Sequence, residues 1–505
     1  MTRFRSDMQS DNPTPNMRLA KLDAETIRAL FGSFDAEEEA PDRFREYFVT
    51  NSFYEAFTSH FPLRIAVGNK GSGKSALLKA SMLEDEGLQD HISVPLTASE
   101  LVGRADNLPQ DSLRAINHWK SVFATEAAAK LITSGVLVPF TGDTSRVMNS
   151  FSSLLTWLSK EAAQRSKGLS DVVIKAGLNL NSAKSITFYL DDLDKGWDGR
   201  IEGLHFVNSI LNACYDISKR DENIKFKIAL RWDLWDAISR VNSDIDKIRQ
   251  NAVFLRWSNH EIYIVVARRV AKFFNIEFPY KMYLDPGRSQ GEIASFFDPI
   301  LERTFRGVGK WDQTPTRQVI LSMTRNRPRD LIALLTLAAE EANRKSRVQI
   351  NTNDLNNIFP RYSEERLNDL MVEYGTRLSG MEELLLSFKP ARSSRKTADS
   401  FRFTNDRMTK HLKELLQRHG TKIRFAYEGR APDYRRLIDF LYRIDFISAW
   451  FTHKDDRRER VSFQDRQLAV SGVAEFGYSW EVLPAYRWAI EPTDVMDVLN
   501  SLTVD

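Results

Sequence analysis

The feature that most constrains the fold of this chain is a glycine-rich turn between an apolar run and an amphipathic stretch. Residues 65–75 read IAVGNKGSGKS and satisfy G-x-x-x-x-G-K-[ST], the pattern of a phosphate-binding P-loop. The apolar residues before the turn predict a buried strand, and SALLKASML after it predicts a helix. The alternative is a glycine-rich β–α turn with an incidental lysine. The flanking strand and helix favour the phosphate site.

The predicted nucleotide-binding residues are those of the loop itself. They are Gly68, Asn69, Lys70, Gly71, Ser72, Gly73, Lys74, Ser75 and Ala76. Backbone N–H groups in such a loop point at phosphate oxygens, at the positive end of the following helix. We expect Lys74 to reach the β- and γ-phosphates and the Ser75 hydroxyl to bind Mg²⁺. No N-K-x-D guanine motif is present, so the predicted cofactors are ATP and Mg²⁺ rather than GTP.

A second apolar run ends abruptly in carboxylates, in the segment SITFYLDDLD at 185–194. Burying charge without a partner is costly, and Mg²⁺ with its triphosphate would supply that partner. We predict Asp191 as the Mg²⁺ partner and Asp192 as the residue that orients or deprotonates the attacking water. Related ATPases often have the longer Glu at this second position, so the hydrolysis rate stays open. Asp194 is expected to cap the next helix or touch a neighbouring subunit. The alternative for the segment is an acidic turn after a strand.

Two arginines are candidates for the ligand site, and Arg231 is the one predicted to report the γ-phosphate. Arg231 follows the predicted strand 226–230, and the carboxyl ends of parallel strands face the ligand. Arg329 follows Pro328 at the head of a strongly apolar helix, where a cation opposes the helix dipole, and this local cost favours a ligand role. The alternatives are a surface arginine at a strand end and a basic helix start. Arg325 and Arg327 are poorer candidates.

Two further stretches carry weaker signals. The aromatic residues of 43–61 recur at roughly helical spacing and predict a packing face, part of which could cover the adenine. Residues 90–184 show no catalytic signature and predict a helical insertion, with amphipathic helices at 116–132 and 148–167. The sequence does not indicate whether this insertion serves specificity or self-assembly.

The order of P-loop, DDLD, strand-ending Arg231 and Pro-Arg helix resembles the AAA+/STAND class of P-loop ATPases, and within it bacterial ATPases with an origin-recognition-like core. The resemblance covers approximately 31–375. It implies a parallel α/β sheet flanked by helices, a helical lid and an ATP-controlled assembly switch. Arg231 would then hold the sensor-one position and Arg329 the sensor-two position. The resemblance also implies a homo-oligomer with an arginine finger supplied by a neighbouring subunit, for which Arg240 and Arg249 are candidates.

The C-terminal third is locally basic. Residues 392–466 contain 19 Lys/Arg against 11 Asp/Glu, a local charge of +8 in a chain of +3. Two amphipathic helices followed by two short strands predict an α+β winged-helix-like domain. Its predicted phosphate contacts lie on the second helix and on the wing of the hairpin. They are Arg435, Arg436, Arg443, Arg457, Arg458 and Arg460. The alternatives are a solvated charged hairpin and a protein-binding winged helix.

The length of 505 residues suggests several domains. We predict a disordered arm at 1–20, an ATPase core at 21–270, a helical lid at 271–375 and the winged-helix-like domain at 376–505. The single cysteine, Cys214, is expected to be buried, and the absence of a long apolar run or secretory signal predicts a cytoplasmic protein without membrane association.

The leading hypothesis is a Mg²⁺- and ATP-dependent regulatory ATPase that changes assembly or partner binding with nucleotide state. By analogy with its class, it would act with an effector protein in defence against phage or mobile DNA. One alternative is a nucleic-acid-loading protein resembling replication initiators. Another is a nucleotide-binding structural subunit with little turnover.

Overall fold

The computed structural model describes residues 19–491 apart from several segments. Those left out are 34–35, 89–90, 106–107, 134–184, 196, 198, 242–244, 286, 288–289, 308–310, 391–397, 427–431, 453–457 and 464–477. The predicted arm at 1–20 therefore lies almost wholly outside the described residues, as does the expected helix at 148–167. No described helix is both long enough and apolar enough to cross a membrane.

A five-stranded, all-parallel sheet forms the centre of the N-terminal half. Its strands are β1 (Leu63–Gly68), β2 (His91–Thr97), β3 (Ser185–Asp191), β4 (Ile224–Arg231) and β5 (Ala252–Phe254). They lie in the order β2-β3-β4-β1-β5, so the P-loop strand sits between β4 and β5. The predicted P-loop NTPase sheet is confirmed.

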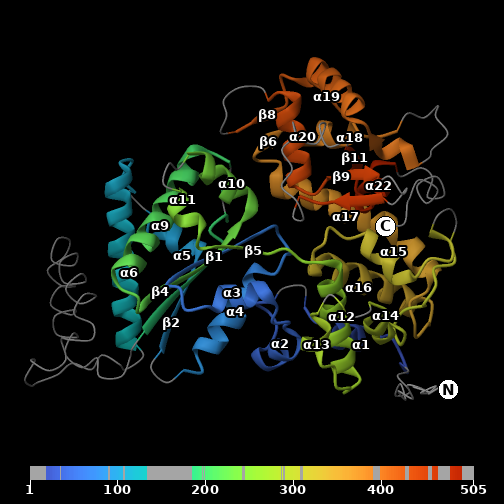
Figure 1. Cartoon of the computed structure of the whole chain (residues 1–505), viewed down its shortest axis with the longest axis horizontal. Coiled ribbons are helices and arrows are strands. Elements are labelled where there is room, and N and C mark those ends of the chain that lie inside the picture. The colour runs from blue at the N-terminus through green and yellow to red at the C-terminus, as the bar shows by residue number, and fades with distance from the viewer. Residues whose placement is uncertain are drawn as a thin grey trace, which may run out of the picture.

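Helices cover both faces of this sheet (Figure 1). Helix α4 (Lys74–Asp85) packs on one face, with Ala66 and Ala229 in that core. Helices α6 (Ser112–Thr133) and α9 (Ile201–Arg220) pack on the other, with Ile65 and Phe226 in a second core. Neighbouring strand residues point to opposite faces, which explains why near-continuous apolar runs were needed in these strands.

Strand β2 corrects one expectation. Residues 90–184 were predicted to be a helical insertion, but their first part is the edge strand of the sheet, paired with β3 along its whole length. The burial of β2 alternates along the chain, and it contains Pro95, which cannot donate a ladder hydrogen bond. An edge strand tolerates both features, since one of its sides needs no partner.

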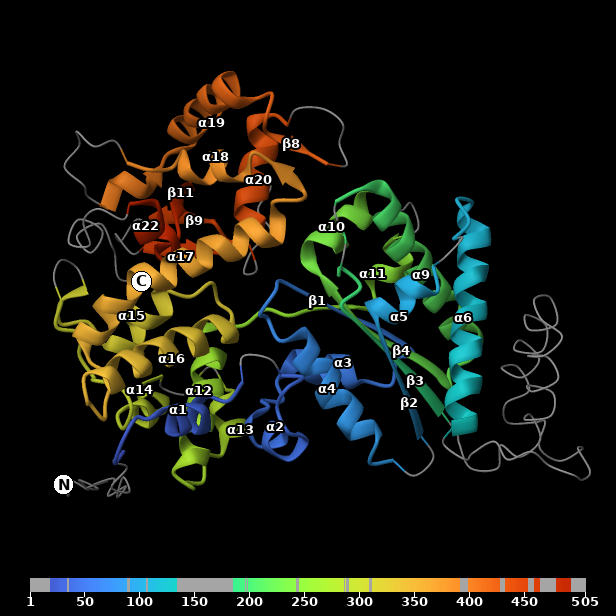
Figure 2. The same ribbon diagram turned by 180° about the vertical axis from the view of Figure 1, so that it is seen from behind.

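A helical unit follows the sheet. Its elements are α12 (Asn259–Phe273), α13 (Tyr280–Tyr283), α14 (Gln290–Ala294), η1 (Ser295–Phe297), α15 (Thr316–Ser322), α16 (Pro328–Arg344) and α17 (Thr352–Tyr374). A capping box formed by Ser258 and Glu261 opens α12. Helix α1 (Ala24–Phe31) packs against α12 and α16, so the start of the described chain lies on this unit rather than on the sheet (Figure 2).

The C-terminal part is mixed α and β. Its elements are β6 (Leu378–Ser379), α18 (Met381–Leu386), η3 (Ala398–Phe401), β7 (Arg402–Phe403), α19 (Asn405–His419), β8 (Arg424–Phe425), α20 (Tyr434–Arg443), β9 (Ile447–Thr452), β10 (Arg458–Val461), β11 (Ser479–Val482) and α22 (Pro484–Ile490). The strands β10-β9-β11-β7 form one antiparallel sheet. Helix α22 packs against the long α17, which joins this part to the helical unit.

The remaining helices surround the sheet. They are α2 (Pro41–Tyr47), α3 (Ser52–Thr58), α5 (Ala98–Gly103), α10 (Trp232–Val241) and α11 (Ile245–Arg249). Figures 1 and 2 show α10 on the side of the sheet that faces the C-terminal part.

Candidate nucleotide site

One cavity of about 470 Å³ brings together the two motifs and both predicted arginines. It lies at the carboxyl ends of β1, β3 and β4, where the order of a parallel sheet opens a crevice for ligands. Its lining includes the P-loop residues and the charged side chains near them, namely Lys70, Gly71, Gly73, Lys74, Ser75, Ala76, Asp191, Asp192, Asp194, Lys195, Arg231 and Arg329. The remaining predicted loop residues, Gly68, Asn69 and Ser72, lie behind this surface.

The loop adopts a backbone that its glycines make accessible. Gly71 and Gly73 have φ values of 82° and 92°, in the left-handed region that side chains disfavour. A Cβ placed on Gly68 would lie 2.4 Å from the Ser72 hydroxyl oxygen, so this position also needs a glycine. The indole N–H of Trp257 donates to the Ser72 carbonyl at 2.7 Å, and this hydrogen bond stabilises the conformation of the loop. Helix α4 begins at Lys74, with its free N–H groups directed at the cavity.

Lys74 lies inside this cradle. Its ammonium group donates to the Asn69 carbonyl at 3.2 Å. Burial lowers the pKa of Lys74, while the nearby carboxylates of Asp194 and Asp191 raise it. A phosphate bound in the loop would accept a stronger, charge-assisted hydrogen bond from the Lys74 ammonium group than the Asn69 carbonyl does.

Ser75 and Asp191 are in direct contact, as expected of two groups sharing a Mg²⁺. Burial raises the pKa of Asp191 to about 6, although a hydrogen bond from the Ser75 hydroxyl opposes the shift. The backbone N–H of Asp192 donates to the Asp191 carboxylate at 2.8 Å. Mg²⁺ uses few protein oxygens together with phosphate and water, and this hydroxyl–carboxylate pair fits that preference.

Asp192 has an unusual backbone. Its φ is 57°, a left-handed conformation that costs most non-glycine residues free energy but that Asp tolerates. The side chain is exposed and lines the cavity. The chain turns sharply here, and Asp194 therefore also faces the cavity instead of capping α9.

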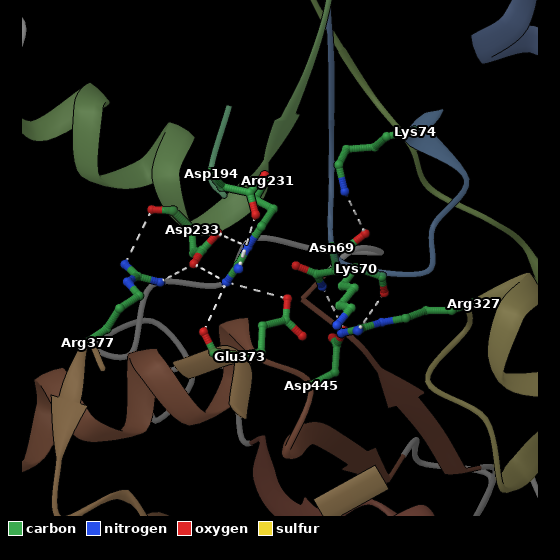
Figure 3. Close-up of polar contacts among 10 residues, drawn as sticks. All are labelled: Asn69, Lys70, Lys74, Asp194, Arg231, Asp233, Arg327, Glu373, Arg377 and Asp445. Atoms are coloured by element: carbon green, nitrogen blue, oxygen red, sulfur yellow. Dashed lines mark hydrogen bonds and ion pairs between the residues drawn. The ribbon is translucent and has the colours of Figure 1, made fainter. Parts of the chain in front are cut away.

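Arg231 is held by carboxylates. It forms ion pairs with Asp233 at 2.7 Å, Asp194 at 3.2 Å and Glu373 at 3.5 Å (Figure 3). Burial would lower its pKa, but these carboxylates outweigh that effect and raise it. Its side chain is 14% exposed, which rules out the surface arginine considered as the alternative. Asp233 also binds Arg377, so this cluster connects β4 to α17 and the segment after it.

The start of α16 touches the P-loop at two points. Arg329 lines the cavity, and a Cβ added to Gly71 would lie 3.1 Å from its Cβ, so the two backbones approach closely. Arg327 was expected to be the poorer candidate, yet it is completely buried and donates to the Lys70 carbonyl at 3.0 Å.

Arg327 also forms the centre of a contact that the sequence did not suggest. It pairs with Asp445 at 2.6 Å, and Asp445 accepts a hydrogen bond from the Asn69 side chain at 2.8 Å (Figure 3). We call these residues, Asn69, Arg327 and Asp445, the loop clasp. The clasp joins the P-loop, the helical unit and the C-terminal part. No local pattern predicts it, because its members are at least 118 residues apart in the chain.

An apolar wall completes the cavity. It includes Phe44, Tyr47, Phe48, Val49 and Phe53 from the aromatic stretch before β1. Further apolar lining residues come from α12 and α16, namely Val265 and Ile332. Most of these side chains belong to the buried core, as predicted for a packing face, and they also line the cavity. A position beside the base stays a prediction. A flat aromatic base would fit such a wall.

The structure corrects the expected basic face of the C-terminal part. Arg435 is exposed, but Arg436 pairs with Asp439, and Arg443 pairs with Asp439 and with Asp236 of α10. Arg460 points to the buried Glu481. Arg443 thereby joins α20 to α10, whereas the Arg436 pair lies within α20 and the Arg460 pair joins β10 to β11. Arg457 lies outside the described residues, as does the side chain of Arg458.

The two candidate finger arginines lie on α10 and α11, the helices between β4 and β5. Arg240 on α10 pairs with Asp236 at 3.1 Å and is 43% exposed, and Arg249 on α11 lies 3.7 Å from Asp246. Neither residue lines the cavity of its own chain. A role as a finger stays a prediction about a neighbouring subunit.

The pKa of Asp191 predicts a pH-dependent metal affinity. Below pH 6 this carboxylate takes up a proton, which competes with Mg²⁺, so we expect the Mg²⁺ affinity of the nucleotide complex to fall about tenfold between pH 7.5 and pH 5. Mg²⁺ titrations at the two pH values would measure it. In Asp191→Asn the part of the pH dependence that comes from the protein should disappear, leaving only that of the nucleotide. An equal drop in both proteins would contradict the assignment.

Comparison with known proteins gives one family match and several similar structures. Residues 292–371 match the FunZ-associated C-terminal helical domain, which here spans most of the helical unit. No curated protein matches the chain. A Walker-type ATPase of Pyrococcus abyssi is 12% identical, with 90% of this chain and 98% of that one covered and a TM-score of 0.35.

Two further solved structures resemble the chain to the same degree. Cdc6p from Pyrobaculum aerophilum is 11% identical over 89% of this chain and 98% of its own, with a TM-score of 0.31. The Aeropyrum pernix ORC2 protein, solved in ADPNP–ADP complexes, is 11% identical over 89% and 96%, with a TM-score of 0.36. The P-loop NTPase fold of this chain is shown by its own sheet order and loop.

Proposed function

We propose that this protein is a Mg²⁺-dependent ATPase whose nucleotide state controls how its C-terminal part is held. The observation that carries the proposal is a single cavity lined by the P-loop, the aspartates after β3, Arg231 and Arg329. Each of these comes from a different element. A ligand with several phosphates and a bound metal ion is one that all of these groups can contact at the same time. The apolar wall opposite favours a nucleotide over inorganic polyphosphate.

Each residue has a role in this proposal. The loop N–H groups and Lys74 bind the phosphates, and Ser75 and Asp191 hold Mg²⁺, which would neutralise charge on the β- and γ-phosphates when bound. Asp192, exposed at the cavity, orients or deprotonates the attacking water. Arg329 approaches from the helical unit and stabilises negative charge on the γ-phosphate. Arg231 is a positioning residue, because its guanidinium holds Asp194 and Glu373 at the edge of the site.

The switch follows from what the P-loop touches. Asn69 belongs to the loop, and its side chain is bonded to Asp445 of the C-terminal part. A change in loop conformation on nucleotide binding or hydrolysis would therefore alter the loop clasp. We propose that this change exposes or hides a surface for self-assembly into a homo-oligomer or for an effector protein. A role in defence against phage or mobile DNA stays a prediction from the class resemblance.

The proposal is tested by Asp192→Asn. We expect multiple-turnover ATP hydrolysis to fall about 100-fold, because the water loses its carboxylate, while ATP affinity stays within about threefold of wild type. Phosphate release and nucleotide binding measure the two quantities separately. Asp246→Asn is the matched control, since that aspartate is 83% exposed on α11 and remote from the cavity lining. A wild-type protein that binds ATP without measurable turnover would favour the structural subunit instead.

A further inference from the structure

A second cavity lies where the sheet unit, the helical unit and the C-terminal part meet. It encloses about 330 Å³ and is lined mainly by polar side chains, among them Asn259, Ser322, Arg325, Asn326, Ser448 and Ser462. Among the described residues it shares only Trp257 with the nucleotide cavity. None of these polar side chains has a role in the proposed ATP hydrolysis, although all of them line the same cavity.

Two of the residues that line this cavity each have a buried polar atom with no hydrogen-bond partner within the described chain. Arg325 donates to Asp330 through Nε at 2.6 Å and Nη2 at 2.7 Å, which leaves Nη1 buried without an acceptor. The hydroxyl of Ser448 is also buried without a partner. Arg325 is 5% exposed and Ser448 is fully buried. Leaving a charged donor unsatisfied is costly, so an acceptor belongs at this position.

The charged groups of the lining favour an anion over a cation as the ligand. Asp445 is the one carboxylate among the described lining residues, and it is already engaged by Arg327 and Asn69. The unpaired Nη1 of Arg325 and the hydroxyl of Ser448 can each donate to an oxyanion, whereas no uncommitted carboxylate remains among the described lining residues to attract a cation. The volume is at the lower end for ligand sites, which selects a small molecule over a peptide or nucleic acid.

We propose that this cavity binds a small metabolite through an oxyanion, either a phosphate or a carboxylate group. The cavity is also connected to the P-loop through one residue of its wall. Asp445 forms part of its wall and accepts a hydrogen bond from Asn69, as Figure 3 shows. An anion beside Arg325 would contact the helical unit and the C-terminal part together, and so hold the loop clasp closed. The cavity is then a regulatory site distinct from the ATP site.

The test uses the full chain carrying Lys74→Ala, so that the P-loop contributes little anion binding. Inorganic phosphate and citrate are titrated in separate calorimetric experiments at constant ionic strength. The discriminating variant is Ser322→Asp, because Ser322 is half-buried at the end of α15 and an added carboxylate there repels an anion in the cavity. Ser322→Asn is the matched control, with the same shape and no charge. Thermal unfolding verifies that both variants are folded.

We expect phosphate, citrate or both to bind, with the anion that binds identifying the ligand class. Ser322→Asp should weaken that binding about tenfold, Ser322→Asn should leave it within about twofold, and Ser448→Ala should weaken it about fivefold. The absence of binding by both anions up to about 10 mM would overturn the proposal. So would binding of equal strength in the Ser322→Asp and Ser322→Asn proteins, because the anion would then lie elsewhere.

Discussion

Replacing Lys74 with alanine is expected to abolish nucleotide-dependent behaviour, with a loss of at least about 100-fold in the affinity for Mg-ATP or in its turnover. Lys74 is the cation within the glycine cradle, and its ammonium group lies near Asp191 and Asp194. Without it, the phosphates of ATP would meet two carboxylates with no compensating charge from the loop. The loss should therefore exceed that of any other single substitution in the cavity.

Binding of Mg-ATP and phosphate release at saturating ATP would measure this loss. The control is Lys219→Ala, which removes an exposed lysine from the last turn of α9. This control should bind and hydrolyse ATP as wild type does. If folded Lys74→Ala protein bound Mg-ATP tightly and kept full turnover, both the site and the proposed function would be wrong.

The second large effect is expected at the loop clasp. Asp445→Asn should destabilise the folded chain by about 3 kcal/mol, because it leaves the completely buried Arg327 without a counter-charge. Asparagine is the informative replacement, since Asp445 has a φ of 58° and Asn tolerates that left-handed backbone. Backbone strain then contributes little to the measured effect. Denaturant unfolding gives the free energy, and hydrogen exchange in α20 reports whether the C-terminal part is released first.

Two controls sharpen this prediction. Glu365→Gln breaks an exposed pair with Arg361 on α17 and should cost about 0.5 kcal/mol or less. Adding Arg327→Met to Asp445→Asn should restore part of the lost stability, because the unpaired buried charge is removed. A double variant less stable than Asp445→Asn by the full cost of a second independent substitution would show that the two residues are not coupled.

Three neighbouring arginines have partners that their local sequence does not predict. Arg325, Arg327 and Arg329 lie within five residues, and only Arg329 was expected to face the nucleotide. It does line the cavity, but Arg327 reaches the P-loop carbonyl and Asp445, and Arg325 is bound to Asp330. Their sequence context is nearly the same. Which partner each one finds depends on elements that pack against the start of α16 from distant parts of the chain.

The pairing of the basic residues in the C-terminal third could not be predicted for the same reason. A count of charges cannot distinguish a solvated arginine from one that joins two helices. Arg443 pairs with Asp236, a residue 207 positions earlier, because α20 docks beside α10. Strand β2 was missed for a different reason: an edge strand with alternating burial and a proline lacks the apolar run that marked β1 and β3.

The sequence by itself determined the phosphate loop, the aspartates after β3 and the two strands, β1 and β3, that carry them. These depend on backbone conformation and hydrophobic pattern over about a dozen consecutive residues, so a local reading suffices. Only the tertiary structure decided that Arg231 is held by three carboxylates, that Asn69 is clasped by Asp445, and that a second polar cavity lies behind them. A buried charge takes its partner from whichever element packs nearest, and that element is chosen by the whole fold.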